Sequence, residues 1–386
     1  MRISILTYAP SGWGGTEANT AGFARALATE GHAVTLVQLG HTEYRDRVGE
    51  GVELCDVELP VDLPGVSVLW WRHLLKSLDT EICALSKGGF EVRSTQLDVA
   101  ARLTARKYVV LEHHPAEPMP PRTSRRHFGG LIRGMGLWWW REFLPRWFHL
   151  RVADRVITDS EHVMNILASS YRLDRAKAFC VHPGADADQI AFRPHARAAL
   201  RSEWGIPDDA LVLGSVGRLA PVKGLERALH AFASLAANDP RPWLVIAGDG
   251  PEREPLRELA QALGLSERVR FPGYVADAVD ALSALDVFLM PSREEGFGIA
   301  LLEALACERV CVAMNSGGPG EIITDRSVGW LTPAGDQEAF AEAIREALRL
   351  SALERQAMGA RARAHMIANF SRDNQMRRLA KLIVEA

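Results

Sequence analysis

The sequence predicts an α/β protein made of two Rossmann-like halves, each a parallel sheet with helices on both faces. Short apolar segments alternate with amphipathic helical segments along the chain, and glycine-rich loops follow several of the apolar segments. That alternation is typical of parallel sheets, whose strands are buried on both faces. The length of 386 residues favours two domains, because single domains rarely exceed about 250 residues.

The first half begins with a βαβ unit. Residues 2–8 form a short apolar run, residues 16–30 follow a helical pattern, and residues 33–39 return to an apolar run. Gly31 is expected to end the helix, because glycine readily adopts the left-handed conformation found after helix C-termini. Further strands of this half are expected at residues 91–95, 108–112, 155–158 and 179–182.

The second half shows the same alternation more clearly. Pro183–Gly184 is the expected junction, so we predict an N-terminal domain over residues 1–184 and a C-terminal domain over residues 185–368. Ser371 is placed to cap a last helix within residues 369–386. Strands of this half are expected at residues 211–216, 243–247, 269–271, 287–290, 310–313 and 329–331, and residues 337–369 are expected to be helical.

Composition and charge argue against several classes of protein. The formal net charge of -3 gives no field that would recruit nucleic acid, and no apolar run reaches the roughly 18 residues of a membrane-spanning helix. The N-terminal run is too short for a signal peptide, and five scattered cysteines do not suggest a disulfide framework, so a cytoplasmic location is expected. Cys307 and Cys311 lack a second pair of ligands nearby, and Asp186-Ala187-Asp188 lacks further ligands, so no metal is expected.

The segment Gly217–Gly224 follows one expected strand and precedes a helix. Turns at the carboxyl edge of a parallel sheet are where open α/β folds bind ligands, and a helix N-terminus favours anions. Arg218 and Lys223 add two full positive charges there. The segment therefore suits a diphosphate, although a surface turn with two solvated cations has the same pattern.

Two glutamates flank a glycine-bounded aromatic residue further along the chain. Glu295 is expected in a loop, and Glu303 inside a helix that starts near Gly298. A carboxylate accepts two hydrogen bonds and so suits the vicinal hydroxyls of a ribose or hexose, while glycines allow a ligand to approach the backbone. The apolar neighbours of Glu303 favour a pocket; the alternative is an exposed helix face.

Several other loops at strand ends are weaker candidates. Ser316–Glu321 is a glycine-rich turn that would offer backbone amides to an anion. Gly248–Pro251 and Phe271–Val275 could frame a base or be simple turns. The pair Gly14-Gly15 opens the first helix, where its amides could approach a phosphate. His113 ends a strand, which makes it a better site candidate than an average histidine in this architecture.

Taken in order, these motifs resemble the retaining glycosyltransferases of family 4, which have the GT-B fold. The resemblance covers nearly the whole chain; each motif is common alone, but the ordered set is specific. The matching residues are Gly14-Gly15, Gly31 to Val34, His113, Ala153-Asp154 to Ser160, His182 to Asp186, Gly217-Arg218 to Lys223-Gly224, Gly248 to Pro251, Phe271 to Gly273, Glu295 to Glu303, and Gly317-Gly318 to Glu321.

The resemblance implies two domains that face each other across a cleft, with the last helix crossing back to the N-terminal domain. It also implies a nucleotide-sugar donor, UDP-sugar by default, and a hydroxyl acceptor such as a glycan, a lipid-linked saccharide or a small metabolite. Arg218 and Lys223 would hold the donor diphosphate. Glu303 would bind the ribose, Glu295 the donor sugar, and His113 would lie near the anomeric carbon. The implied donor-binding residues are Gly14, Gly15, Gly217, Arg218, Lys223, Gly248, Gly273, Tyr274, Glu295, Gly296, Phe297, Gly298 and Glu303, and the implied catalytic residues are His113, Arg218, Lys223 and Glu295.

The implied chemistry retains the anomeric configuration and needs neither a protein nucleophile nor a metal. The departing phosphate oxygen would help to deprotonate the acceptor, while cationic side chains stabilise the leaving diphosphate. The sequence departs from the family at His114, where aspartate is common, and at Pro319, which stands one place early in its turn. A sugar-nucleotide epimerase or phosphorylase, and a non-catalytic glycan-binding relative, are the alternative functions.

A basic aromatic segment extends from Arg122 to Arg151. It holds seven arginines and one acid, Glu142, with tryptophans and phenylalanines interleaved. Arginine with tryptophan is typical of contact with anionic lipid headgroups, so peripheral membrane contact through residues 122–151 is one hypothesis. The alternative is an amphipathic helix whose aromatic side chains pack inward and whose arginines face solvent.

Overall fold

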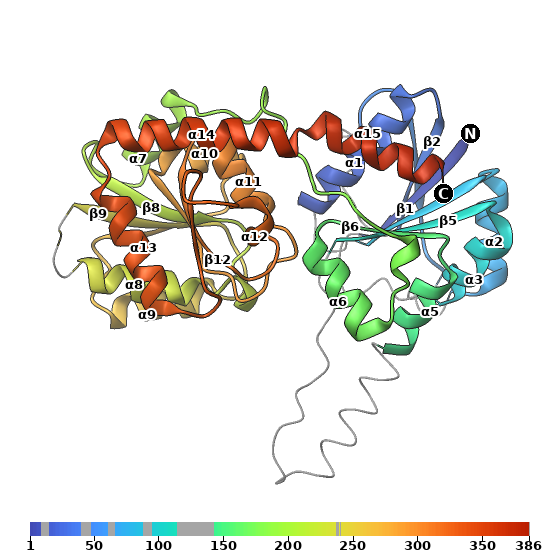
Figure 1. Cartoon of the computed structure of the whole chain (residues 1–386), viewed down its shortest axis with the longest axis horizontal. Helices are drawn as coiled ribbons and strands as arrows, with labels where there is room; N and C mark the ends of the chain where they lie inside the picture. Colours follow the sequence, from blue (N-terminus) through green and yellow to red (C-terminus); the bar gives the residue numbers. More distant parts are fainter. Residues whose placement is uncertain are drawn as a thin grey trace, which may run out of the picture. The chain divides into compact units, whose positions relative to one another are not determined.

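A computed structural model gives the fold of the chain as two compact units, each built on one sheet (Figure 1). Unit 1 comprises residues 1–184 and 373–386, and unit 2 comprises residues 185–372. The structure describes residues 1–8, 15–39, 48–60, 66–87, 95–113, 143–236, 239 and 241–385. The candidate residue Gly14 and residues 122–142 of the basic aromatic segment lie outside these ranges.

Unit 1 has a seven-stranded parallel sheet in the order β3-β2-β1-β4-β5-β6-β7. From β1 the chain adds strands first on one side and then, from β4 onward, on the other. Ligands of open α/β sheets bind at such a reversal, outside the carboxyl ends of the strands. The strands are β1 (Arg2–Tyr8), β2 (Ala33–Leu39), β3 (Val52–Val57), β4 (Ile82–Lys87), β5 (Lys107–Glu112), β6 (Arg155–Thr158) and β7 (Ala178–Cys180).

Helices cover both faces of the unit 1 sheet. Side chains of α2, α3, α5 and α6 form the core of one face, and side chains of α1 and α15 form the core of the other. Gly31 follows α1 with a φ of +86°, which confirms its expected role at the helix end. The helices are α1 (Gly15–Thr29), α2 (Val68–Ser77), α3 (Thr95–Thr104), α5 (Leu144–Val152), α6 (Glu161–Tyr171) and α15 (Arg372–Val384).

The last helix, α15, belongs to unit 1 although more than 180 residues separate it from the rest of that unit. Leu379 and Ile383 are buried in the same core as Phe23 of α1. The guanidinium of Arg155 at the start of β6 donates to the carbonyl of Leu382 at 2.6 Å. Arg155 also donates to the carbonyl of Glu385 at 2.8 Å. Apolar burial and these two hydrogen bonds to the C-terminal end of α15 hold the helix on the sheet.

Unit 2 has a six-stranded parallel sheet in the order β10-β9-β8-β11-β12-β13. Side chains of α10, α11 and α14 pack on one face, and those of α8, α9 and α13 on the other. The strands are β8 (Leu211–Val216), β9 (Pro242–Ala247), β10 (Val269–Gly273), β11 (Val287–Met290), β12 (Val310–Met314) and β13 (Trp330–Thr332). The helices are α7 (Pro194–Glu203), α8 (Leu225–Ala236), α9 (Arg253–Ala262), α10 (Ala278–Ala284), α11 (Ile299–Ala306), α12 (Pro319–Ile322), α13 (Gln337–Arg349) and α14 (Ala352–Phe370).

A buried ion pair attaches α7 to this sheet. Arg201 exposes only 2% of its surface, and its guanidinium donates to Asp286 Oδ2 and to the carbonyl of Ala284, each at 2.8 Å. The same carboxylate oxygen accepts from the amide of Val212 at 2.8 Å. A buried charge is tolerated when its partners are complete, so this group of contacts has a structural role.

The fold places two groups of residues that were considered as possible metal ligands. Cys307 and Cys311 are fully buried, and burial raises the pKa of the Cys307 thiol to about 12, so both are thiols of the apolar core. Asp186 accepts from the amides of Asp188 and Gln189 at 3.0 and 3.2 Å. Its carboxylate therefore closes a turn. None of the described helices combines the length and apolar character needed to cross a membrane.

The described end of the basic aromatic segment does not match either interpretation completely. Arg146 on α5 lies inside unit 1, 3.8 Å from a carboxylate oxygen of Glu112 and over the ring of Tyr171. Its side chain is only 10% exposed. Arg151 is exposed and stacks on the half-buried ring of Trp147. The expectation of solvated or lipid-facing arginines is therefore wrong for Arg146, because Glu112 provides a buried counter-charge.

Candidate active site

Three loops meet at the carboxyl edge of the unit 2 sheet, after β8, β9 and β10. The amide of Gly248 donates to the carbonyl of Gly273 at 2.7 Å, and the amide of Gly217 donates to the carbonyl of Ala247 at 3.0 Å. Gly248 has a φ of +139°, and a Cβ there would lie 1.8 Å from the oxygen of Gly217. Only glycine fits this contact, so the candidate glycines Gly217, Gly248 and Gly273 form one continuous backbone surface.

The loop after β8 carries the two candidate cations. Lys223 ends a 3-10 turn, and Gly224 follows with a φ of +58°. A Cβ on Gly224 would lie 2.5 Å from the carbonyl oxygen of Pro291, so this loop packs directly on the loop after β11. Arg218 is exposed, and its guanidinium makes no hydrogen bond or ion pair with the residues that the structure describes.

The structure brings Lys223 and Glu295 together although 72 residues separate them in the sequence. Lys223 Nζ lies 2.7 Å from Glu295 Oε2, and the buried Ser292 hydroxyl donates to the same oxygen at 3.1 Å. The lysine side chain remains 31% exposed. Lys223 can therefore meet an anionic ligand while Ser292 keeps the carboxylate in place.

The glycine-rich turn after β12 holds the Glu295 loop. The amide of Glu295 donates to the carbonyl of Ser316, and the amide of Gly318 donates back to the carbonyl of Glu295, each at 3.0 Å. A Cβ on Gly318 would lie 2.2 Å from Cα of Phe297. The amides of Gly318, Gly320 and Glu321 all bond to backbone carbonyls. The expectation that this turn offers amides to an anion is therefore wrong for these three residues. The turn instead holds the Glu295 loop through backbone hydrogen bonds.

Glu303 lies in the second turn of α11, as its spacing predicts. Gly298, with a φ of +111°, stands at the N-cap of that helix, and Gly296 and Phe297 before it are buried. Burial raises the pKa of the half-buried Glu303 carboxyl to about 7, even though Arg372 acts in the opposite direction. Within the described chain, its carboxylate has no hydrogen-bond or ion-pair partner. A ligand hydroxyl would supply one.

One candidate residue of unit 2, Tyr274, and one of unit 1, Gly15, have fewer described contacts. Tyr274 follows β10 and is 77% exposed, so no contact in unit 2 fixes its ring. Gly15 is the first residue of α1.

In unit 1, His113 follows β5 and exposes 6% of its surface. Its Nδ1 lies 2.8 Å from Asp159 Oδ2, and its Nε2 lies 3.0 Å from Ser86 Oγ. Sequence reasoning missed Asp159 and Ser86, because aspartate and serine are common at strand ends. The available signal was their position: they lie at the ends of β6 and β4, the strands on either side of β5.

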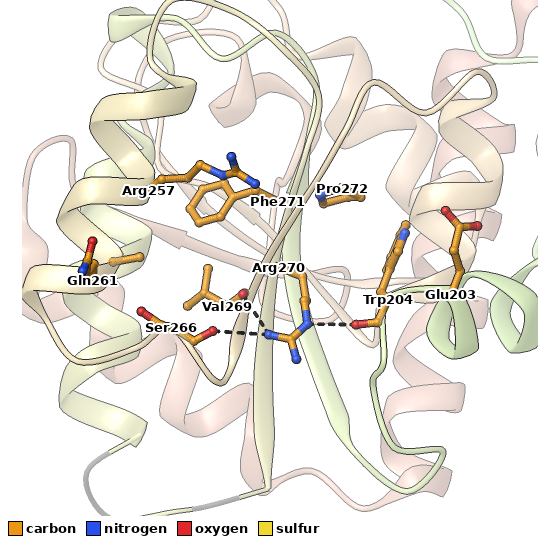
Figure 2. Close-up of a pocket in the computed structure, with 10 residues that line it drawn as sticks. Glu203, Trp204, Arg257, Gln261, Ser266, Val269, Arg270, Phe271 and Pro272 are labelled. Atoms are coloured by element: carbon orange, nitrogen blue, oxygen red, sulfur yellow. Dashed lines mark hydrogen bonds between the residues drawn. The ribbon is translucent and has the colours of Figure 1, made fainter.

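A separate cavity of about 430 Å³ lies beside the edge strand β10 (Figure 2). Its walls come from β10, from α9 and from the end of α7, and include Trp204 and Phe271. Arg270 crosses it and donates to the carbonyls of Trp204 and Ser266. None of Lys223, Glu295 and Glu303 lines this cavity, so the candidate site is elsewhere.

Comparison with known families and structures agrees with this geometry. A model described as "Glycosyl transferases group 1" matches residues 196–365, and one described as "Glycosyltransferase Family 4" matches residues 13–189. The solved structure of HepE from Anabaena with UDP superposes with a TM-score of 0.79 at 18% identity, covering 100% of both chains. A glycosyltransferase from Rickettsia africae gives 0.79 at 19% identity, covering 100% of this chain and 98% of that one.

Fold and site together define a two-unit α/β protein of the GT-B class. The two family models, which between them match most of the sequence, identify it further: the chain belongs to the family 4 glycosyltransferases. The D-inositol 3-phosphate glycosyltransferase of Mycobacterium tuberculosis is 35% identical over 230 residues, which is 58% of this chain and 46% of that protein. The enzyme of the same name from Saccharomonospora viridis is 36% identical over 209 residues, covering 51% and 48%. The chain spans about half the length of the curated relatives it matches.

Proposed function

We propose that the chain transfers a sugar from a nucleotide-sugar donor to a hydroxyl acceptor, and that unit 2 binds the donor. One observation carries the proposal. Lys223, paired with Glu295, and the helix that carries Glu303 follow β8 and β11 at the carboxyl edge of the unit 2 sheet, the edge that also presents the glycine-lined backbone surface, and this edge is where such sheets bind ligands. A UDP-sugar is the first donor to test, because HepE, which shares the fold, was solved with UDP.

The charges of the site suit the parts of such a donor. Lys223 and Arg218 would bind the diphosphate and stabilise the charge that develops on it as the glycosidic bond breaks. Lys223 contributes a compact charge on a flexible stem, and Arg218 a planar fork that matches phosphate oxygens. Glu303, which has no partner among the described residues, would accept hydrogen bonds from the ribose hydroxyls, and Glu295 from the sugar.

Retention of the anomeric configuration and independence of metal are further parts of the proposal. With cationic side chains on the leaving diphosphate, the protein can supply the charge stabilisation that a divalent ion supplies in other transferases. The departing phosphate oxygen would take the acceptor proton. An epimerase or phosphorylase would need the same donor groups, so the release of free epimerised sugar nucleotide without acceptor would favour that alternative.

The acceptor and any membrane contact also belong to the proposal. At the described end of the basic aromatic segment, the exposed Arg151 stacks on the half-buried ring of Trp147, an arginine–tryptophan pair of the kind that supports contact with anionic headgroups. Co-sedimentation with phosphatidylserine vesicles at physiological salt tests peripheral contact. Protein that stays in the supernatant with these anionic vesicles would remove the hypothesis.

A thermal-shift screen over UDP-, GDP- and ADP-glucose tests the donor directly. A donor that binds the folded state stabilises it by mass action and so raises the unfolding midpoint. The added stability is about 2.7 kcal/mol when the donor concentration is 100 times Kd. We expect one of the three sugar nucleotides to raise the midpoint of the wild-type protein. The shift should disappear in Lys223→Ala and should not change when EDTA is added. No shift with any of the three would contradict the donor assignment, and a shift abolished by EDTA would contradict metal independence.

A further inference from the structure

Three strand ends and helix α1 bring a line of buried polar side chains together at the carboxyl edge of the unit 1 sheet. Thr20 lies on α1, Ser86 on β4, His113 directly after β5 and Asp159 directly after β6. Thr20 Oγ1 is 2.7 Å from Ser86 Oγ, which is 3.0 Å from His113 Nε2. The other ring nitrogen, Nδ1, is 2.8 Å from Asp159 Oδ2. Both nitrogens of the imidazole are therefore held by the protein.

Burial makes these contacts strong and directional. Ser86 is fully buried, Thr20 exposes 2% and Asp159 9% of its surface. Hydrogen bonds in a medium of low dielectric are stronger than in water, and a buried network restricts its members to one geometry. The bond to Asp159 involves an ionisable carboxyl, the stronger kind, so it is the contact that determines the orientation of the ring.

The chemistry of the partners determines where protons can be. An ionised Asp159 only accepts, so Nδ1 carries a proton. In the neutral ring Nε2 accepts from the Ser86 hydroxyl, whereas in the cationic ring Nε2 donates to Ser86. Because hydroxyls both donate and accept, Ser86 and Thr20 can serve either state by reversing their hydrogens. The ring can therefore change charge while its heavy atoms stay in place.

Three carboxylates face the ring from three elements. Burial alone lowers the pKa of His113, but Asp159, through its charge and its hydrogen bond, and then Glu112 and Glu17, raise it above its usual value. Glu112 is on β5 and Glu17 on α1. Asp159 is the one of the three in direct contact with the imidazole.

Glu112 also has two basic neighbours on α5, His149 and Arg146. His149 Nε2 lies 3.7 Å from Glu112 Oε1, and Arg146 Nη2 lies 3.8 Å from Glu112 Oε2. Asp98 bonds His149 in turn. The charge of Glu112 is thus shared with α5, which leaves Asp159 as the principal counter-charge of His113.

We propose that Asp159 is a positioning residue that fixes the orientation and the charge of His113, with the Ser86–Thr20 hydroxyl pair as its counterpart at Nε2. The proposal rests on the proposed function and on the place near the anomeric carbon that the family resemblance implies for His113. Asp159 itself touches no substrate in this scheme; it acts through the ring. The role is therefore visible in the protonation of His113 and in turnover, and not in donor binding by unit 2.

The first test needs no donor. Histidine ¹³Cε1–¹H NMR on the full chain, with His113 assigned through His113→Gln, gives the midpoint of its titration. Asp159→Asn keeps an oxygen that accepts from Nδ1–H but removes the charge, so the midpoint should move to lower pH. Asp154→Asn, at the opposite end of the same strand, is the matched control and should leave it unchanged. An unchanged midpoint in Asp159→Asn would overturn the proposal.

The second test is steady-state hydrolysis or transfer with UDP-glucose. Asp159→Asn should lower kcat by about tenfold or more, the scale found when a metal-binding histidine loses the partner that orients it, with the KM for UDP-glucose within about twofold of wild type. An unchanged kcat, or a KM that rises in proportion to the loss, overturns the positioning role. If wild-type protein does not act on UDP-glucose, the choice of donor fails, and the NMR midpoints still decide the role of Asp159.

Discussion

The polar groups of the two units differ in how completely the protein itself pairs them. In unit 1, His113 is bonded at both ring nitrogens and nine-tenths buried. In unit 2, Glu303 has no bonding partner among the described residues and Lys223 keeps a third of its side chain exposed beside a single carboxylate. Paired groups fix geometry, whereas groups with unused bonding capacity are available to a ligand. The units therefore differ in what their polar residues can be used for.

The largest expected effect follows from removing the exposed cation of unit 2. Lys223→Ala should lower kcat by about 100- to 1000-fold, the usual cost of losing one preorganised group that stabilises transition-state charge. The fold should persist, because the lysine is partly exposed and its partner Glu295 keeps Ser292. Steady-state kinetics with the donor found by thermal shift measure kcat, and circular dichroism checks that the variant is folded.

Lys381→Ala is the matched control for that substitution. Its side chain is 73% exposed and pairs only weakly with Glu385 at 3.8 Å, so activity should stay within about twofold of wild type, as expected for an exposed pair. If Lys223→Ala turned over donor as fast as this control, unit 2 would not hold the diphosphate through Lys223.

The converse effect is expected in unit 1, where a buried polar group should matter for stability. Asp98 exposes 3% of its surface and accepts from the Tyr108 hydroxyl at 2.7 Å and from His149. Asp98→Ala leaves both partners buried with a missing acceptor, so the free energy of unfolding should fall by about 2–3 kcal/mol. Urea denaturation checks this, with Asp209→Ala, at an exposed position without a positive φ, as control. Equal stability of the two variants would break the contrast between the units.

The strands of unit 2 were predictable because its sheet is buried on both faces. All six were expected within one or two residues, since short apolar runs such as Val287–Met290 leave little choice of element. Unit 1 was harder. Two strands were missed, β3 (Val52–Val57) and β4 (Ile82–Lys87), because acidic residues interrupt the run of β3 and the apolar run of β4 ends at Ser86. The strand expected at residues 91–95 is wrong at Thr95, where α3 begins, and its other residues lie outside the described ranges.

The candidate site was predictable only where backbone geometry dictates the residue type. Gly217, Gly248 and Gly224 stand where a side chain would meet a carbonyl or the backbone is left-handed, so glycine marks those loops in the sequence. Contacts between distant side chains carry no such mark. The bond between Lys223 and Glu295 depends on how two loops pack, and the residue types alone allow many partners.

The smallest effect we expect concerns the pH dependence of unit 2. The pKa of Glu303 is about 7 in the folded protein, against about 4.3 in an unfolded chain. Between these values the folded state holds a proton that the unfolded state has released, so stability falls as pH rises through this window and stays lower above it. Glu303→Gln cannot ionise and should escape that loss. The variant should match wild type near pH 5 and exceed it at pH 8 by about 1 kcal/mol, allowing for partial solvent access.

Urea denaturation at a series of pH values measures that difference without any ligand. Donor binding should show the opposite trend, because ribose hydroxyls donate better to an ionised carboxylate. The affinity of wild type for the donor should therefore rise as pH passes about 7, and the affinity of Glu303→Gln should be weak and flat. Parallel stability curves for the two proteins would mean that the Glu303 carboxyl is well solvated, and the contrast with the paired groups of unit 1 would then not extend to this residue.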